Sequence, residues 1–290
     1  MVSACKKLNF PSEAIEVLEE SRQALLADEA VCGLLQKAQD SLFEPGSREF
    51  LDILQTVAEK SGIARYTVDM VFLLLALKPL QQKYQEDGLP ENLLWETMED
   101  LTYKLYECRD VKGVWGTFVT SWFKGFYECT RFKLGRLEYE KVPYYQDGYK
   151  DLVKNGDIVL NCHIPSSGPL KEADVLESLR RAYEFYPEVR FDGKMVLICH
   201  SWLLYPPHYD VYPEGGNLRK FYDLFDVVSS EAKPENHNFW RVFNRDYDPA
   251  ILDQVPADTR LRRNFLKFLK EGNPMGNGFG VIVYDGEKIV

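Results

Sequence analysis

The spacing of apolar residues changes once along this chain, near residue 130, and that change limits which folds the chain can adopt. Before it, apolar side chains recur every three or four residues, which is the period of an amphipathic helix. From Arg131 onward, short alternating or wholly apolar runs, typical of strands, alternate with helical segments. The pattern predicts an α+β protein, with an all-helical domain over residues 1–130 and a mixed α/β domain over residues 131–290.

The first 130 residues are divided into helices by glycine, proline and serine at residues 45–47, 61–62 and 87–90. The longest wholly apolar run, residues 70–77, is far shorter than the roughly 18 residues of a membrane span, so it predicts a buried helix. Trp115, Phe118, Trp122 and Phe126 follow one another at intervals of three and four residues. We interpret this aromatic stripe as core packing or as the seam between the domains, with a cofactor platform as the alternative.

Several strands are predicted after residue 130. We expect a bulged strand over residues 132–139, because the alternation slips at Gly135 and Arg136. Further strands are predicted over residues 158–163, 195–200, 226–230, 239–243 and 278–284, and helices over residues 172–186, 217–225 and 258–269. Residues 275–280 are rich in glycine but precede a strand, so we attribute these glycines to turns and close strand packing rather than to a dinucleotide cradle.

Two of the predicted strands end in the same dipeptide, Cys162-His163 in one and Cys199-His200 in the other. If the strands are parallel neighbours, their alternation places both histidines on one face of the sheet and both cysteines on the other. Ligands of α/β sheets bind beyond the carboxyl ends of the strands, where both histidines would lie. We therefore predict a functional site at these strand ends, with a packing role for the histidines as the alternative.

A metal centre at these dipeptides is not expected. Adjacent strand residues point to opposite faces, so one dipeptide cannot easily give two ligands to one ion, and the usual CxxC and HxxxH spacings are absent. A metal-assisted or serine-type hydrolase stays an alternative because Ser166 and Ser167 follow His163, although the G-x-S-x-G motif is missing. The same loop, residues 163–169, contains small residues whose amides can approach an anion at the start of the next helix.

A second candidate anion site lies where the last predicted helix begins. Its start contains an aspartate, a threonine and three arginines, and one more arginine precedes them: Asp258, Thr259, Arg260, Arg262, Arg263 and Arg241. Cations are unfavourable at a helix N-terminus, so a bound phosphate or pyrophosphate would offset their cost. The alternative is that acidic side chains neutralise these arginines on a solvated face.

Charge and cysteine content limit the partners of the chain. A formal net charge of −10 at pH 7 and a pI near 5.1 argue against a general binder of nucleic acid or of anionic membranes. The six cysteines are scattered, and no charged-then-apolar leader follows Met1. We therefore expect reduced thiols and a cytoplasmic protein, and the oligomeric state stays open.

With these segments in place, the sequence resembles a bacterial family of acyltransferase-domain proteins. Its members have a helical N-acyltransferase N-terminal domain and a GNAT-like C-terminal domain. The resemblance is carried, in order along the chain, by residues 122–123, 131–140, 163–170 (His-Ile-Pro-Ser-Ser-Gly-Pro-Leu), 199–204 (Cys-His-Ser-Trp-Leu-Leu) and 256–261 (Pro-Ala-Asp-Thr-x-Leu). These segments extend over essentially the whole chain, so the resemblance implies the same pair of domains.

The resemblance implies transfer of an acyl group from acyl-coenzyme A, as co-substrate, to the amine of a small molecule, without a metal. In such enzymes a general base takes the amine proton, a general acid protonates the departing thiolate, and a backbone amide of a splayed strand holds the oxyanion. His163 or His200 would be the base, because histidine titrates near neutral pH. Tyr284 or Cys199 would be the acid.

The sequence departs from this family at the pyrophosphate loop, Q/R-x-x-G-x-G/A, which it lacks. The arginine-rich start of the helix at residues 258–269 is the substitute that the sequence suggests, since it follows the predicted strand over residues 239–243. The main alternative function is therefore a non-catalytic GNAT-like module that binds a small ligand or a protein.

Overall fold

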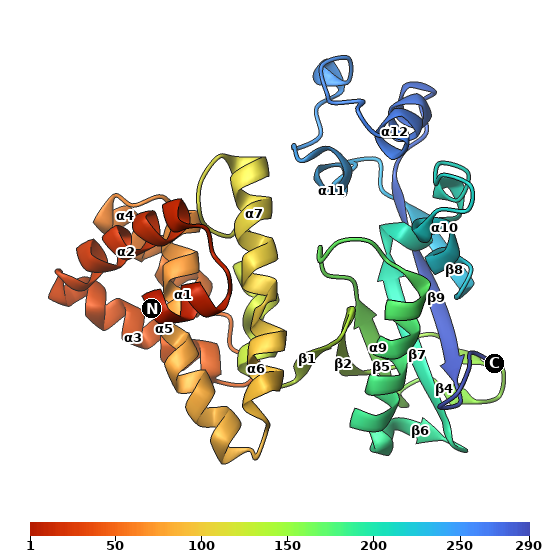
Figure 1. Cartoon of the computed structure of the whole chain (residues 1–290), viewed down its shortest axis with the longest axis horizontal. Coiled ribbons are helices and arrows are strands. Elements are labelled where there is room, and N and C mark those ends of the chain that lie inside the picture. Colours follow the sequence, from red (N-terminus) through yellow and green to blue (C-terminus); the bar gives the residue numbers. More distant parts are fainter. The chain divides into compact units, whose positions relative to one another are not determined.

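Residues 1–133 and 134–290 form two separate units in the computed structural model, which describes every residue of the chain (Figure 1). The first unit is helical and the second combines helices with a mixed sheet, so the predicted α+β class is confirmed. The division falls between Lys133 and Leu134, shortly after the change in hydrophobic spacing. Each unit buries apolar residues of its own.

The helical unit consists of consecutive helices joined by short connections. They are α1 (Val2–Lys7), α2 (Ser12–Leu26), α3 (Glu29–Phe43), α4 (Phe50–Ser61), α5 (Arg65–Glu86), α6 (Glu91–Met98), α7 (Asp100–Lys112), the 3-10 helix η1 (Thr120–Phe123) and α8 (Lys124–Tyr127). Helices α4 and α7 both end at a glycine with left-handed backbone, Gly62 and Gly113, a conformation that glycine adopts at little cost. These glycines explain where the two helices stop.

Helix α5 is the central helix of this unit because nearly all of its sides are apolar. It packs against α2, α3, α4, α6 and α7, and residues 67–74 are all buried. A helix without a polar face is stable only inside a protein or a bilayer. The buried helix predicted for residues 70–77 is thus confirmed. None of the helices combines the length and the apolar character that a membrane crossing requires.

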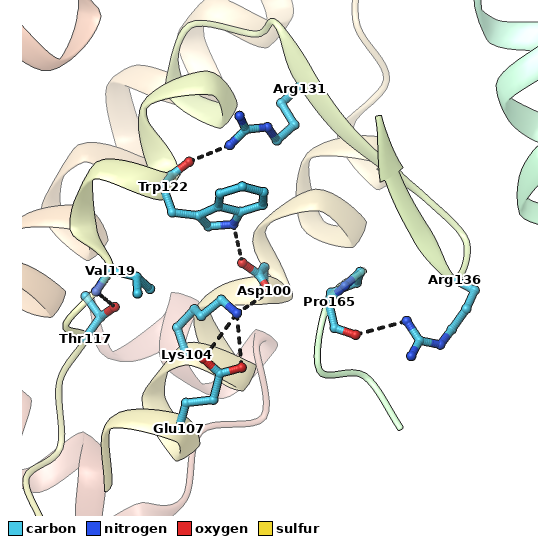
Figure 2. Close-up of polar contacts among 9 residues, drawn as sticks. All are labelled: Asp100, Lys104, Glu107, Thr117, Val119, Trp122, Arg131, Arg136 and Pro165. Carbon is cyan, nitrogen blue, oxygen red and sulfur yellow. Dashed lines mark hydrogen bonds and ion pairs between the residues drawn. The ribbon is translucent and has the colours of Figure 1, made fainter. Parts of the chain in front are cut away.

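The aromatic stripe at residues 115–126 belongs to the helical unit but does not form one continuous helix. Trp115 and Phe126 are buried, whereas Trp122 is half-buried, with the Arg131 guanidinium 3.9 Å from its ring centre. The Trp122 indole Nε1 donates to the buried Asp100 carboxylate at 2.9 Å, and Arg131 donates to the Trp122 carbonyl (Figure 2). The stripe therefore packs and anchors the end of the helical unit.

The second unit is built on a sheet with strand order β1-β2-β5-β7-β9-β8. Its strands are β1 (Arg131–Leu134), which spans the division of the chain, β2 (Leu137–Pro143), β5 (Ile158–His163), β7 (Lys194–Ser201), β8 (Asp226–Ala232) and β9 (Gly276–Tyr284). The short β6 (Arg190–Phe191) pairs with β7, and β3 (Gly148–Tyr149) pairs with β4 (Val153–Lys154) in a separate hairpin. The helical elements are α9 (Glu172–Phe185), η2 (Pro187–Val189), η3 (Trp202–Leu204), η4 (Pro206–His208), α10 (Asn217–Tyr222), α11 (Trp240–Phe243), η5 (Pro249–Ile251) and α12 (Arg260–Lys270).

The two faces of this sheet are covered by different elements. Helix α9 joins the parallel strands β5 and β7, and its buried Ser178 hydroxyl lies 2.9 Å from the hydroxyl of Tyr139 on β2. On the opposite face, Val159, Ile198 and Phe279 belong to a core cluster that also contains Tyr144, Tyr149 and Val153. We call these the α9 face and the hairpin face of the sheet.

Two local predictions are wrong. Gly135 and Arg136 form a tight turn between β1 and β2 instead of a bulge, and Gly135 has a left-handed φ of 81° there. Residues 239–243 contain helix α11 instead of a strand, and the rings of Phe239 and Phe243, one helical turn apart, stack with centres 4.4 Å apart. An apolar run this short shows no period that would distinguish a strand from a helix.

Candidate functional site

Strands β5 and β7 are parallel neighbours, as the two Cys-His dipeptides require. The last residue pair in their register is Asn161 with Ile198, although β5 continues to His163 and β7 to Ser201. On their outer sides, both strands stay paired to these ends, β5 with β2 and β7 with β9. Only the inner edges therefore lose their partner, which leaves backbone groups there for another molecule to bind. We call residues 162–163 and 199–201 the open strand ends.

The prediction that the cysteines and the histidines of the two dipeptides lie on opposite faces of the sheet is confirmed. The register places Cys162 beside Tyr139, on the α9 face, and Cys199 in line with it on β7. Both thiols are buried, and their mutual contact, followed by burial, raises the pKa of Cys199 well above its ordinary value. Cys199 is therefore a protonated thiol at neutral pH.

His163 lies on the hairpin face and belongs to a cluster of three side chains. Its Nε2 lies 2.7 Å from Glu140 Oε1, and Asn161 Nδ2 lies 3.2 Å from both atoms. Because a carboxylate only accepts hydrogen bonds, Nε2 carries the hydrogen and Nδ1 carries the lone pair of the neutral ring. A carboxylate thus holds the neutral ring of His163 with its hydrogen on Nε2, and only 21% of the side chain is exposed.

His200 shares this face but is held less closely. Its Nε2 lies 3.6 Å from Glu231 of β8, and its side chain is 44% exposed. Glu231 also makes a closer ion pair with Lys233, at 2.7 Å. The structure therefore brings both predicted histidines to one end of one face, but only His163 has a tightly bound carboxylate partner.

The loop after His163 presents hydrogen-bond donors beyond the end of β5. The Ser167 hydroxyl is buried and has no hydrogen-bond partner, and the backbone amides of Ser167, Gly168 and Leu170 also lack one. Helix α9 begins directly after this loop, at Glu172, so the unpaired amides of its first turn lie in the same part of the chain. An orphaned hydroxyl among unpaired amides is a set of donors suited to phosphate oxygens.

The arginine-rich start of α12 is engaged within its own segment. Arg262 lies 3.0 Å from Asp258 and donates to the Val242 carbonyl, while Arg263 donates to the carbonyls of Ala257 and Asp258. The side-chain hydrogen bond from Arg262 lowers the pKa of Asp258.

The remaining predicted residues of this segment complete the same arrangement. Thr259 caps α12 by accepting from the Arg262 amide, Arg260 is exposed, and Arg241 lies over the Trp240 ring. The Arg262–Asp258 pair corresponds to the alternative in which acidic side chains neutralise the arginines. The segment also follows a helix rather than the strand expected for residues 239–243.

Tyr284 is not brought together with the histidines. It pairs with Met195 at the start of β7, whereas the open strand end of β7 pairs with Gly278 at the other end of β9. Its ring packs on Tyr183 and its hydroxyl donates to the Gly286 carbonyl.

Neither chemistry of the hydrolase alternative finds support. No group of three or more histidine, cysteine, aspartate or glutamate side chains is placed to hold a metal ion. The Ser167 hydroxyl makes no hydrogen bond, whereas a nucleophilic serine requires a hydrogen-bonded base.

Glu140 and Asn161 are two residues of the His163 cluster that were not predicted from the sequence. The sequence did contain a signal, because two strands that are otherwise apolar each carry polar residues at alternate positions. These are Glu138 and Glu140 in one strand, and Asn161 and His163 in the other. Alternation alone does not tell which strands are neighbours, so the contact between the pairs could not be inferred.

Residues 1–129 match the model of the N-acyltransferase N-terminal domain, and residues 132–282 match that of the GNAT-like C-terminal domain. No curated protein sequence matches the chain.

Solved structures with this fold include acyltransferases bound to acyl-coenzyme A. An acyltransferase in complex with decanoyl-CoA is 23% identical with a TM-score of 0.76 and covers 95% of this chain and 85% of its own. An acyltransferase mutant with octanoyl-CoA is 23% identical with a TM-score of 0.75, and an acyltransferase with decanoyl-CoA and teicoplanin is 21% identical with a TM-score of 0.73. Each of these two covers 96% of this chain and 85% of its own. At this identity the likeness establishes the fold.

Proposed function

Because this chain belongs to the family defined by the GNAT-like C-terminal domain and also carries the N-acyltransferase N-terminal domain, we propose that it is an acyl-coenzyme A-dependent N-acyltransferase. The observation that carries the proposal is the pair of open strand ends, flanked by a carboxylate-held histidine and an anion-accepting loop. Structures of the same fold bound to octanoyl-CoA and decanoyl-CoA support a medium-length acyl chain.

The diphosphate of coenzyme A would bind at residues 164–171 rather than at α12. The loop between β5 and α9 supplies unpaired amides and the orphaned Ser167 hydroxyl, while Arg262 and Arg263 of α12 already have partners in their own segment. Glu172 and Asp174 occupy the first turn of α9, so the loop amides, more than the helix dipole, would hold the anion. The glycine-rich motif that the sequence lacks is replaced in this proposal by a proline-flanked loop.

The thioester would lie between the open strand ends, with the amine on the hairpin face. There the Nδ1 atom of His163 takes the amine proton as the nitrogen attacks the thioester carbon, and Glu140 stabilises the imidazolium that forms. An unpaired backbone amide of the open strand ends would hold the oxyanion. As the carbon–sulfur bond breaks, the thiol of Cys199, which its raised pKa keeps protonated, would give a proton to the leaving thiolate.

A small-molecule amine is the proposed acceptor. Glu140 and Glu231 give the hairpin face two carboxylates beside the histidines, which suits a cationic amine before it loses its proton. Six unpaired cysteines also support our inference that the protein works in a reducing compartment, the cytoplasm.

Ligand binding tests the first part of this proposal. Decanoyl-CoA at a hundredfold excess over its dissociation constant should stabilise the native state by about 2.7 kcal/mol and raise the melting temperature. The absence of any shift with acyl-CoA of any chain length would contradict the proposal. A clear shift without release of free thiol in the presence of a panel of amines would instead favour the binding-module alternative, which the missing glycine-rich motif motivates.

Substitution of the histidines tests the second part. His163→Gln should lower kcat by roughly a hundredfold, the usual contribution of a general base, with little change in acyl-CoA affinity. His200→Gln, on the same face but without a close carboxylate, is the matched control and should have a smaller effect. An equal loss in both variants would contradict the assignment of His163.

A further inference from the structure

Arg136 crosses from the β1–β2 turn to the loop between β5 and α9 and donates hydrogen bonds to three of its carbonyl oxygens. Its Nη1 lies 3.0 Å from the Pro165 oxygen, its Nη2 2.7 Å from the Gly168 oxygen and its Nε 3.3 Å from the Pro169 oxygen. Figure 2 shows the contact with Pro165. The Arg136 side chain is 9% exposed, so this is a built contact rather than a surface encounter.

Two of these contacts decide where the amides of Ser166 and Leu170 point. All peptide bonds of the chain are trans, so the N–H of each peptide group points away from its own carbonyl. With the Pro165 and Pro169 carbonyls turned to Arg136, the amides of Ser166 and Leu170 are turned to the opposite side. Pro169 carries no N–H, and the Gly168 φ of 92° lets the chain reverse between the two prolines.

Such an arrangement suits anion binding because carbonyl oxygens repel an anion. A phosphate-binding loop needs its amides to converge and its carbonyls to point elsewhere, which glycine-rich loops achieve through their conformational freedom. A loop with two prolines has little of that freedom. The rigid guanidinium group of an arginine can hold the carbonyls on one side of the loop, so that the amides point to the other side.

We propose that Arg136 is the positioning residue of the coenzyme A diphosphate loop, holding three carbonyls back so that the amides and the Ser167 hydroxyl face the phosphates. The inference rests on the proposed function, because it assigns a role within that acyl-CoA site. It accounts for a GNAT-like domain that lacks the glycine-rich motif. Arg136 acts through the loop and does not itself touch the reacting atoms.

Calorimetric titration of full-length variants with two ligands tests the proposal. The ligands are coenzyme A and decanoyl-pantetheine, which has the acyl and pantetheine parts but no phosphates. Arg136→Gln should weaken coenzyme A binding by about tenfold or more, in keeping with the loss of charge-assisted hydrogen bonds, and leave decanoyl-pantetheine binding unchanged. Arg136→Lys keeps the charge but not the fork, and should restore only part of the affinity.

Arg180→Gln is the matched control, because Arg180 lies exposed on α9 and pairs only with Glu177 and Glu184 of its own helix. It should bind both ligands as the wild type does. Circular dichroism and melting temperature establish whether each variant is folded. If Arg136→Gln is not folded, Arg136→Lys replaces it in the test.

Three results would overturn the proposal. Wild-type affinity for coenzyme A in folded Arg136 variants would show that the loop does not need the guanidinium. Equal weakening of both ligands would show a general structural role instead of phosphate positioning. A wild-type protein that binds no coenzyme A would overturn the proposed function together with this inference, whereas the first two results leave the function standing.

Discussion

At the scale of single residues, His208 is the most buried of the four histidines. It is 0% exposed, its Nδ1 donates to the Trp202 carbonyl at 2.8 Å, and its Nε2 is buried without a partner. Aromatic rings of Trp202, Tyr205 and Phe265 enclose it, with the nearest ring centre 4.9 Å away. Burial lowers the pKa of His208 from 6.5 to about 4.

This pKa predicts how stability depends on acidity. Between pH 6.5 and about 4 the unfolded chain binds a proton at His208 that the folded chain does not, so the free energy of unfolding falls as the pH is lowered through this window. The loss amounts to about 3 kcal/mol at most. Urea midpoints at intervals from pH 4 to 7.5 measure it.

His208→Phe tests the assignment of this pH dependence. The variant loses the hydrogen bond to Trp202 but should show a flatter dependence on pH over the same range. His237→Gln, at an exposed position, should keep the wild-type slope. A wild-type slope in His208→Phe would assign the effect to other groups.

Residue identity allowed His163 and His200 to be predicted as site residues before the fold was known. It did not reveal Glu140 or Arg136. Charged residues on strands and turns are most often solvated, and the contacts of these two join residues that lie 29 and 23 positions apart in the sequence.

At the scale of elements, the C-terminus of α3 depends on a side chain from α8. Helix α3 ends at Phe43, and its C-cap Glu44 is extended instead of left-handed, so it does not satisfy the last carbonyls in the usual way. Lys124 does this instead, because its Nζ lies 2.9 Å from the Ser41 oxygen, 2.8 Å from that of Leu42 and 2.5 Å from that of Glu44.

Lys124→Met should therefore destabilise the protein. The substitution keeps the apolar stem but removes three charge-assisted hydrogen bonds, for an expected loss of about 2 kcal/mol or more. Lys83→Met breaks only the pair between Lys83 and Asp87 on the surface and should cost well under about 1 kcal/mol. Urea denaturation of both variants decides, and equal losses would contradict a capping role for Lys124.

The glycines near residue 278 serve close packing, as the sequence analysis expected. A Cβ on Gly278 would lie 1.8 Å from the Leu204 carbonyl oxygen, and one on Gly280 would lie 2.8 Å from the Leu204 side chain. The segment containing η3 thus rests directly on β9, immediately after the open strand end of β7.

Gly278→Ala should lower the melting temperature strongly, because two backbones must move apart, and should also disturb the open strand ends. Gly33→Ala is the matched control. Gly33 lies within α3 with nothing near its missing Cβ, so the same substitution should stabilise the protein by up to about 1 kcal/mol. Opposite shifts of the two melting temperatures are expected, and a neutral Gly278→Ala would contradict the packing argument.

At the scale of the whole molecule, charge constrains the partners. The net charge of −10 repels polyanions over distances longer than any single contact, whereas acyl-CoA needs only one set of local donors. Fluorescently labelled duplex DNA should therefore show no binding at micromolar protein in about 0.15 M salt, while a labelled acyl-CoA binds in the same buffer. Saturable DNA binding under these conditions would contradict the exclusion of nucleic acid.

The sequence by itself determined the division into a helical and a mixed unit, the buried helix α5, most strands and the Cys-His ends of two of them. These features follow from spacing and turn residues, which act over a few neighbours along the chain. The bulge predicted at Gly135 and the strand predicted at residues 239–243 are wrong, because segments this short contain too few residues to show a period.

Only the tertiary structure decided how the site is assembled. The order of strands sets which edge of β5 loses its partner, which carboxylate meets His163 and which loop Arg136 reaches. These contacts join residues that are distant in sequence, and their free energy arises from burial and hydrogen bonding after the chain has folded. No local pattern encodes them.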